Sequence, residues 1–500
     1  MIALVEARGY KCLRYIRQPL ERFHILVGPN ASGKTTFLDV IAFLGDVLRE
    51  GPQKAVEKRC RSLKELVWMG EGDAFELAVE MVPPESVLNG KHREYRRCRY
   101  EVCVGVSHHG GGVRLLGENF WLLKASSEVQ KPQQRSLFPM EHEPAGPVVR
   151  PSRKQTPPGW RKVVSLREEG QAYFRSETTD WNFPLRPGWE RAALSMVPDE
   201  AERFPISTWA RALLTRGVQV LILNSLLMRW PCRPDMPDTF QPDGSNLPLA
   251  VRRLREHQPD RFRRWLRHIQ TILPDVQDIE VKEREEDRYL YLVVRSGEAR
   301  IPSWLLSDGT LRLLALTLLA YLPSENAIYL IEEPENGIHP RAIEGVFQSL
   351  SSVYEGQVLL ATHSALLLGL AKPEHILCFA RTERQATDIV RGDEHPALRE
   401  WRDVWVWSKD QAVASALDLS LSDLEDLLKD GKPSSPKETL ERVLWERRIP
   451  RSSSLYEDIA SKVDFTRCTD PAFRLLWETL RRWFGPKDTQ FPQEVQCPEP

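Results

Sequence analysis

One short segment near the N-terminus constrains the fold of this 500-residue chain more than any other. Its spacing, G-x-x-x-x-G-K-[ST], is that of a phosphate-binding P-loop, which requires a strand before it and a helix after it. The apolar residues at 23–27 predict that strand, and residues 35–50 predict the helix. The segment therefore predicts a nucleotide site. It reads Gly28-Pro29-Asn30-Ala31-Ser32-Gly33-Lys34-Thr35.

The chemistry of such a loop follows from its residue types. Its glycines let backbone N–H groups turn toward an anion, and the start of the helix adds partial positive charge at the same point. Lys34 can reach the β- and γ-phosphates, and the Thr35 hydroxyl can hold Mg²⁺. We expect the nucleotide to contact Gly28, Pro29, Asn30, Ala31, Ser32, Gly33, Lys34, Thr35 and Thr36.

Composition excludes several other classes of protein. A net charge of −1 argues against bulk electrostatic binding to nucleic acid, although a local basic patch remains possible. The eight cysteines are scattered without zinc or disulfide spacing, which predicts reduced thiols. The first residues carry charge where a signal peptide needs an apolar run, and the longest apolar stretch, 313–322, is about half a membrane span. We therefore expect a cytoplasmic protein with no membrane partner.

The second half of the chain holds three further polar clusters. Ser307-Asp308-Gly309 opens a long apolar helix, and a helix start of this kind can hold a phosphate. A buried-type strand at 327–331 ends in Glu332 and Glu333, and another at 357–361 is followed by His363. Polar residues at the ends of such strands point into the ligand crevice of an open α/β sheet. Alone, the acids could form a plain turn and the histidine a loop, but their order after the P-loop favours a site.

These motifs, taken in order, resemble an ABC-type ATPase head of the branch shared by RecF and the SMC proteins. Within that branch, GPNASGKTT, LSDGTLR and EEPENGIHP are most similar to the compact AAA-type and OLD-type ATPases of bacteria. Those ATPases are frequently components of anti-phage defence systems. The resemblance covers residues 1–120 and 245–395.

The resemblance implies a role for each matching residue. Lys34 acts in catalysis, Thr35 and Glu332 hold the metal, Glu333 is the catalytic glutamate and His363 is the switch histidine. Ser307, Asp308 and Gly309 match the signature motif, which meets the γ-phosphate bound to a partner subunit, and Asn336–His339 falls at the D-loop. Two departures stand out: Glu332 replaces the commoner Asp, and the signature is Ser-Asp-Gly-Thr rather than Ser-Gly-Gly-Gln. The implied cofactors are ATP and Mg²⁺.

The predicted fold class is α/β, a P-loop NTPase with an ABC-type head whose mixed sheet has flanking helices. We expect 1–120 and 245–395 to form the head, 121–244 to be an insertion, and 396–500 to be a helical module. The insertion looks irregular over 125–160 and helical over 208–227. Long heptad arms are missing, so the chain is not a chromosome-bridging SMC protein.

The leading functional hypothesis is an ATP-hydrolysing homodimer, or higher oligomer, that regulates a separately encoded effector in phage defence. A nuclease is the expected effector, because no acidic TOPRIM triad follows His363. The alternative is a RecF-like DNA-repair ATPase that contacts DNA through arginines on a helical run at 245–272, broken at Pro259. The simpler interpretation of those arginines is a solvated helix face. A transporter ATPase is disfavoured by the long insertion.

Two weaker patterns favour ordinary structure over chemistry. Asp275 and the Glu280-Val281-Lys282 run mimic a nuclease motif but fit an alternating strand. The adjacent His108 and His109 have no third ligand nearby, which favours a polar turn over a metal site.

Overall fold

In the computed structural model, contacts divide the chain into two units: Met1–Trp401 with Pro450–Ser452, and the remainder. All the helices and strands named below lie in the first unit. The expected helical module at 396–500 lies almost wholly outside the described residues. The structure describes residues 1–395, except 89–93, 107–111, 125–134, 136, 144–145, 151–155, 168–169, 187, 189, 201 and 324–325, and also residues 444–445 and 448–451.

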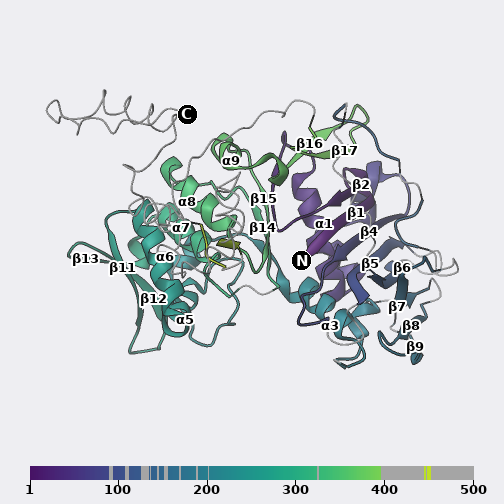
Figure 1. The fold of residues 1–500 in the computed structure, drawn as a ribbon, viewed down its shortest axis with the longest axis horizontal. Helices are drawn as coiled ribbons and strands as arrows, with labels where there is room; N and C mark the ends of the chain where they lie inside the picture. The colour runs from purple at the N-terminus through teal and green to yellow at the C-terminus, as the bar shows by residue number, and fades with distance from the viewer. Residues whose placement is uncertain are drawn as a thin grey trace, which may run out of the picture. The chain divides into compact units, whose positions relative to one another are not determined.

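The P-loop strand lies inside a six-stranded mixed sheet (Figure 1). The first five strands in the order below are parallel, and only the last is antiparallel to its neighbour. The carboxyl ends of the parallel strands therefore share one edge, where ligands bind in open α/β sheets. This confirms the predicted α/β P-loop fold. The order is β10 (Val218–Leu221), β14 (Ile328–Glu332), β15 (Gln357–Ala361), β3 (Phe23–Val27), β16 (Ile376–Arg381) and β17 (Thr387–Arg391).

Successive side chains along the buried strands point to opposite faces of this sheet, so both faces are apolar. On β14, Ile328 and Leu330 join the core around helix α1 (Lys34–Glu50), whereas Tyr329 and Ile331 join a second core on the opposite face. The second core is made with helices from the later part of the chain, which Figure 1 shows beside β14 and β15. These helices are α5 (Leu247–His257), α6 (Pro259–Ile272), α7 (Asp308–Leu318), α8 (Pro340–Leu350) and α9 (Ala365–Leu370).

An eight-stranded antiparallel sheet packs on the α1 core. Its strands confirm the expected strand at 74–82 and the expected hairpin on either side of residue 110. Fully buried Gln357 ties the two sheets together, since its Oε1 accepts from Ile2 N (2.9 Å) and its Nε2 donates to Ile2 O (2.8 Å). The order is β2 (Leu13–Pro19), β1 (Ile2–Tyr10), β4 (Ala74–Met81), β5 (Tyr95–Val106), β6 (Val113–Lys124), β7 (Trp160–Leu166), β8 (Ala172–Arg175) and β9 (Asn182–Leu185).

The expected helix over 208–227 is wrong in its second part. Helix α3 (Pro205–Ala212) runs into one π-helical turn, and then β10 joins the P-loop sheet beside β14. Helix α4 (Ser225–Arg229) follows. Tertiary pairing overrides the helical pattern here, because Val218 and Val220 suit a strand and Gly217 lets the chain approach Asn326 O closely.

The described residues between 135 and 159 contain no helix or strand, but some are anchored on β17. Asp388 is buried and accepts hydrogen bonds from Arg135 Nη1 (2.9 Å) and Met140 N (2.9 Å), and it contacts His142 Nε2 at 3.0 Å. The division of the chain into a head, an insertion and a C-terminal module stays a prediction.

The run at 245–272 breaks between α5 and α6, as the proline at 259 predicted. The expected strands on either side of residue 285 are confirmed within a small antiparallel sheet of β11 (Val276–Glu283), β12 (Leu290–Ser296) and β13 (Ala299–Pro302). Helix α2 (Pro52–Glu57) follows α1. Short 3₁₀ helices occupy Leu63–Glu65, Trp68–Gly70, Leu194–Met196, Ser303–Leu305 and Pro373–His375.

Two buried histidines make the stability of the fold depend on pH. Burial lowers the pKa of His24 to about 3 and that of His268 to about 4. Because an unfolded histidine titrates near 6.5, the unfolded chain binds protons that the fold excludes, so this stabilisation is complete above about pH 6.5 and is lost as pH falls. We expect the free energy of unfolding to drop by about 2 kcal/mol per histidine between pH 7 and pH 5. Urea unfolding at several pH values in this range gives the free energy of unfolding as a function of pH. This free energy should fall less steeply with falling pH in His268→Gln than in wild type, and equal pH dependences would contradict the prediction.

Within the residues that the structure describes, no helix combines the length and the apolar character needed to cross a bilayer. The six cysteines that it describes form no disulfide with one another.

Candidate nucleotide site

The P-loop joins the end of β3 to the start of α1, as its motif predicts. The Lys34 side chain curls back over the loop, where Nζ donates to Gly28 O (2.7 Å) and Pro29 O (3.0 Å). Burial lowers the pKa of Lys34, against the opposing influence of Glu333 and Glu332. The Lys34 ammonium group therefore has two carbonyl partners in this structure. Bound phosphates would have to take their place as acceptors.

Two loop glycines are required by close packing. Gly28 has φ 153°, and a Cβ there would lie 2.2 Å from Phe379 O on β16. Gly33 has φ 106°, and a Cβ there would lie 2.5 Å from Thr387 Oγ1 on β17. The Thr387 hydroxyl also donates to Ser32 O (2.9 Å). The β16–β17 pair therefore fixes the shape of the loop from outside.

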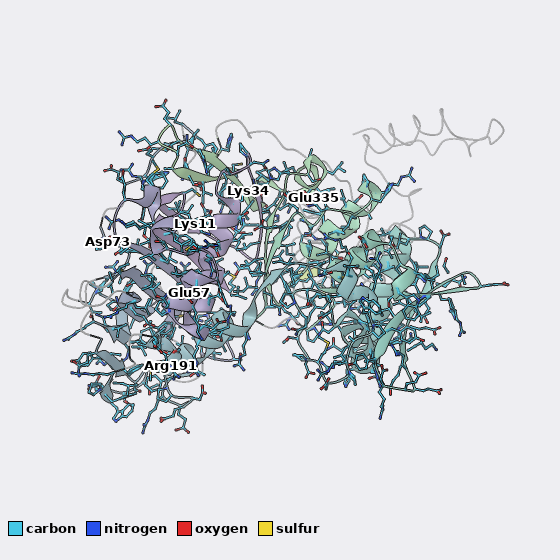
Figure 2. All side chains as sticks on the ribbon, turned by 180° about the vertical axis from the view of Figure 1, so that it is seen from behind. Lys11, Lys34, Glu57, Asp73, Arg191 and Glu335 are labelled. Carbon is cyan, nitrogen blue, oxygen red and sulfur yellow. The ribbon has the colours of Figure 1, made fainter. Side chains whose placement is uncertain are left out.

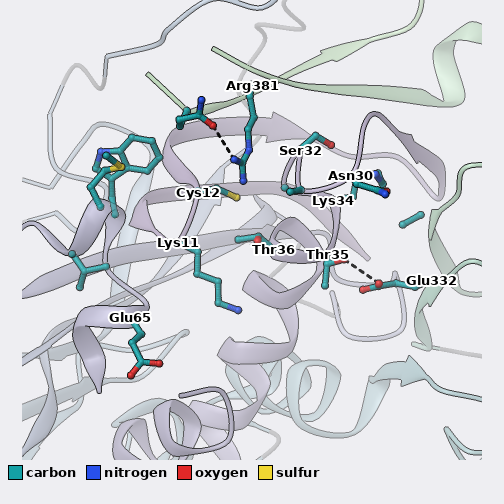
Figure 3. Close-up of a pocket in the computed structure, with 18 of the residues that line it drawn as sticks. Lys11, Cys12, Asn30, Ser32, Lys34, Thr35, Thr36, Glu65, Glu332 and Arg381 are labelled. Carbon is teal, nitrogen blue, oxygen red and sulfur yellow. Dashed lines mark hydrogen bonds between the residues drawn. The ribbon is translucent and has the colours of Figure 1, made fainter. Parts of the chain in front are cut away.

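The acidic strand end meets the P-loop directly. Thr35 Oγ1 donates to Glu332 Oε2 at 3.0 Å, shown by a dashed line in Figure 3. A hydroxyl and a carboxylate oxygen are hard oxygen ligands of the kind that Mg²⁺ takes, with phosphates and waters completing its shell. The two predicted metal ligands are therefore adjacent, and both are accessible.

Glu333 is held in an unusual backbone conformation beside this pair. Its φ is 46°, and its N–H donates to Ala361 O (2.8 Å) at the end of β15. The Asn336 side chain donates to Glu333 Oε2. The carboxylate is thus oriented by a neighbour in the following turn, and non-glycine residues at positive φ cluster at functional sites.

A cavity of about 910 Å³ brings together the predicted catalytic and metal residues and all the predicted P-loop residues except Gly28 and Pro29. Residues from the P-loop and from the ends of two other strands line it, as the close-up in Figure 3 shows in part. From the opposite side of the molecule, Lys34 appears between Lys11 and Glu335 (Figure 2). The predicted residues in the cavity wall are Asn30, Ala31, Ser32, Gly33, Lys34, Thr35, Thr36, Glu332, Glu333 and His363.

Sequence reasoning missed the other wall of this cavity. It comes from the β1–β2 turn, from the loop at 64–70, and from the β16–β17 turn, where Arg381 Nη1 donates to Gln385 Oε1 (2.9 Å). Of the residues on this wall, only Arg381 could have been recognised from the sequence, because it is a polar residue at the end of a buried strand. The residues concerned are Lys11, Cys12, Lys64, Glu65, Val67, Trp68, Met69, Gly70, Arg381 and Gln385, with Ala361 on β15.

Glu335 is a second missed residue, and it connects the acidic turn to the histidine turn. Its Oε1 accepts from Thr362 Oγ1 (2.5 Å) and from His363 N (3.2 Å). Its Oε2 is buried without a hydrogen-bond partner in the described residues. Glu335 therefore sets where the backbone of His363 lies relative to Glu333.

We expect Glu335→Ala to lower the turnover of ATP about tenfold while leaving the affinity for ATP within a factor of two, because it removes the acceptor that positions His363. Glu335→Gln keeps one acceptor oxygen and is the matched control. Steady-state kinetics that separate kcat from KM provide the measurement. Equal losses in the two variants would show that the charge of Glu335, not its acceptor role, matters.

The Ser-Asp-Gly turn is not among the residues that line this cavity. Ser307 caps α7, and its Oγ accepts from Thr310 N at 3.1 Å. Asp308 pairs with Arg229 at 2.5 Å, and a Cβ on Gly309 would lie 2.3 Å from Gly337 O. The structure thus brings together every predicted catalytic and metal residue. It places the Ser-Asp-Gly turn, which we call the signature turn, elsewhere in the same subunit.

The arginines of α5 and α6 are largely engaged within the chain. Arg252 pairs with Glu256 (2.9 Å) and Glu283 (3.1 Å), and the others named below also have acidic partners. These contacts favour the solvated helix face over a phosphate-contacting face. The other pairs are Arg253 with Asp238, Arg255 with Asp278, Arg261 with Glu355, and Arg263 with Asp260.

The nuclease-like pattern also resolves into ordinary structure. Glu280 and Lys282 lie on β11 and pair with each other at 3.1 Å. Among the described residues, no group of three or more His, Cys, Asp or Glu could hold a metal ion. His108 and His109 lie outside the described residues.

A family model matches two separate parts of the chain, residues 23–86 and 238–369, and its description is "AAA domain, putative AbiEii toxin, Type IV TA system". These segments carry the P-loop, the Ser-Asp-Gly turn, the acidic strand end and His363. Residues 23–86 and 238–369 are therefore similar to this AAA domain. The match covers less than half of the 500 residues.

Solved structures similar to this chain include three SMC heads. An SMC head bound to the C-terminal winged-helix domain of ScpA is 14% identical, with a TM-score of 0.45, and covers 78% of this chain and 96% of its own. An SMC head from Pyrococcus furiosus with an extended coiled coil, bound to the C-terminal domain of ScpA, is 12% identical, with a TM-score of 0.41. The match covers 78% of this chain and 95% of that one. An SMC head from Thermotoga maritima is 11% identical, with a TM-score of 0.35, and the match covers 78% of this chain and 98% of that one. Among curated protein sequences, none matches this chain.

Proposed function

We propose that this chain binds and hydrolyses ATP with Mg²⁺ at the cavity between the P-loop and the ends of β14 and β15. The observation that carries the proposal is the 3.0 Å contact between Thr35 and Glu332, with Lys34 and Glu333 in the same cavity. Four groups that phosphoryl transfer needs thus converge from segments about 300 residues apart in the sequence.

The chemistry assigned to this site divides among named atoms. The backbone N–H groups of the P-loop and Lys34 Nζ bind and orient the phosphates. Thr35 Oγ1 and Glu332 would hold Mg²⁺, which neutralises charge that develops on the phosphate oxygens. Glu333, steadied by Asn336, orients the attacking water and accepts its proton, and His363 contacts the phosphate that is transferred. The D-loop residue Asn336 is thus placed to support the general base.

We further propose that two copies sandwich two nucleotides, each completed by the partner's signature turn. The proposal is supported by the position of Ser307, Asp308 and Gly309 outside the cavity of their own subunit. The test is light scattering after size exclusion of Glu333→Gln with and without ATP. A doubled mass with ATP supports the sandwich, and an unchanged mass contradicts it.

The biological role that we propose is control of a separately encoded effector, such as a nuclease, in anti-phage defence. Its support is the family description, which names a toxin of a TA system, together with the order of motifs in the sequence. Purification of the tagged chain from its native host should recover a companion protein, and the amount recovered should differ between wild type and Glu333→Gln. A preparation that contains this chain alone would contradict the role while leaving the ATPase proposal intact. The arginine pairs described above give the DNA-repair alternative no added support.

A further inference from the structure

Strand β17 is the last strand of the P-loop sheet, and its two sides contact different parts of the chain (Figure 1). Successive side chains of a strand point to opposite faces, and two successive polar residues of β17, Thr387 and Asp388, are both buried. Thr387 contacts the P-loop, whereas Asp388 contacts a segment from the middle of the chain. We call this segment the strap. It consists of residues 135 and 137–143, and β17 lies between it and the P-loop.

Thr387 sets the direction of one peptide unit in the P-loop. Its hydroxyl donates to Ser32 O at 2.9 Å, and its own N–H donates to Cys12 O at 3.0 Å, so the residue is held at both its side chain and its backbone. The C=O and N–H groups of a planar trans peptide point in opposite directions. Because Thr387 holds Ser32 O on the β17 side, the N–H of Gly33 in the same peptide unit is turned toward the cavity that Gly33 lines. An N–H group turned in this way can bind a phosphate oxygen.

Asp388 holds the strap on the opposite side of β17. This carboxylate is 1% exposed, and it accepts from Arg135 Nη1 (2.9 Å) and Met140 N (2.9 Å). It also contacts His142 Nε2 (3.0 Å) and accepts from Ile389 N (2.8 Å). Burial alone would raise the pKa of Asp388, but the hydrogen bonds from the strap, that of His142 foremost, and the charge of Arg135 lower it, so the group is charged at neutral pH. Without the strap, the Ile389 N–H would be the one donor left of these four, and a buried charge with so few partners is strongly destabilising.

The strap is also held to the turn between β16 and β17. Its Glu141 accepts from Arg14 Nη1 (2.7 Å) on β2 and from Thr382 Oγ1 (3.3 Å) in that turn, and Arg384 Nη1 lies 3.8 Å from the same carboxylate. The turn supplies part of the cavity wall, whereas the strap residues are not among those that line the cavity. The strap therefore fixes β17 both at its turn and at Asp388, from outside the nucleotide site.

We propose that the strap regulates the affinity of the nucleotide site. While it contacts Asp388, β17 holds Thr387 against Ser32 of the P-loop; when it is displaced, this contact is released and ATP binds more weakly. The inference rests on the proposed binding of ATP and adds to it a means of regulation from outside the cavity. Thr387 is a positioning residue for the P-loop, and Arg135 and His142 act through it. A partner that withdraws the strap would therefore release the nucleotide without touching the cavity.

The first test removes the hydroxyl of Thr387. Thr387→Val keeps the shape of the side chain but loses the donor to Ser32 O, so the affinity for ATP should fall about fivefold. Thr387→Ser keeps the donor and is the matched rescue variant, with an affinity within about twofold of wild type. Isothermal titration of the full chain with ATP and Mg²⁺ gives both values. Equal affinities in the valine and serine variants overturn the role of Thr387.

The second test displaces the strap. Arg135→Ala/His142→Ala removes two partners of Asp388 and should weaken ATP binding about as much as Thr387→Val does. The matched control is Glu143→Ala, an exposed strap residue whose ion pair is with Arg14 on β2, and it should bind ATP as wild type does. In steady-state kinetics, the loss in the double variant should appear in KM, with kcat within about twofold of wild type, because Glu333 lies elsewhere. Adding Thr387→Val to the double variant should weaken binding by less than about a further twofold, since both changes act through one contact.

The outcomes separate this inference from the proposed function. A wild-type chain that binds no ATP overturns both. If wild type binds ATP and the double variant binds it equally tightly, the strap inference is overturned and the ATP site stands. A lower kcat with an unchanged KM, or losses that multiply in the triple variant, also overturn the inference. If the double variant melts at a much lower temperature than wild type, His142→Ala alone serves instead; we expect about a threefold weakening, and an unchanged affinity again overturns the inference.

Discussion

Replacing Glu333 with glutamine should lower ATP hydrolysis by about a hundredfold or more, because the amide cannot accept the proton of the attacking water. The affinity for ATP should stay within about threefold of wild type, since Lys34, Thr35 and Glu332 are untouched. Phosphate release under saturating ATP measures the first quantity, and equilibrium binding with labelled ATP measures the second. The hydrogen bond from Asn336 need not be lost, because the glutamine oxygen can still accept it.

The matched control is Glu344→Gln, which changes an exposed glutamate on α8 outside the cavity. It should hydrolyse ATP at the wild-type rate. If Glu333→Gln hydrolyses ATP as fast as this control, the general base lies elsewhere, and Glu335 or His363 becomes the next candidate. If both hydrolysis and binding collapse, the negative charge of Glu333 is needed to hold the site together, and the variant does not identify the general base.

The sequence was sufficient to predict the half of the site that lies on strand ends. Glu332, Glu333 and His363 each end or follow a buried apolar strand, and parallel strands share an edge, so their convergence on Lys34 could be derived from pattern alone. The P-loop strand lies beside β15, and β15 beside β14, which places the three polar ends in adjacent positions.

The opposite wall could not be derived in this way. Lys11, Trp68 and Met69 stand on turns whose position depends on how the eight-stranded sheet packs on α1, and turns carry no periodic signal. Strand β10 was missed because the apolar spacing of 208–227 fits a helix, whereas its pairing with β14 depends on a segment more than 100 residues away. Non-local pairing is the common cause of both failures.

Replacing Lys34 with methionine should weaken ATP binding on the order of a hundredfold, which corresponds to about 3 kcal/mol. Methionine keeps most of the length of the lysine side chain but removes every side-chain N–H donor, and hydrogen bonds from a charged donor to phosphate are the strong kind. Isothermal titration with ATP and Mg²⁺ gives the dissociation constant directly. Thermal unfolding of the nucleotide-free variant checks that the fold survives the loss of the bonds to Gly28 O and Pro29 O.

Lys54→Met is the control for this prediction, because it removes an equivalent charge from the exposed side of α2. Its dissociation constant should match that of wild type. Equal affinities in Lys34→Met and Lys54→Met, with both variants folded, would mean that the nucleotide does not bind through the P-loop lysine. The contact between Thr35 and Glu332 would then require an explanation other than a magnesium site, since without the phosphates the two side chains supply too few ligands to hold the ion.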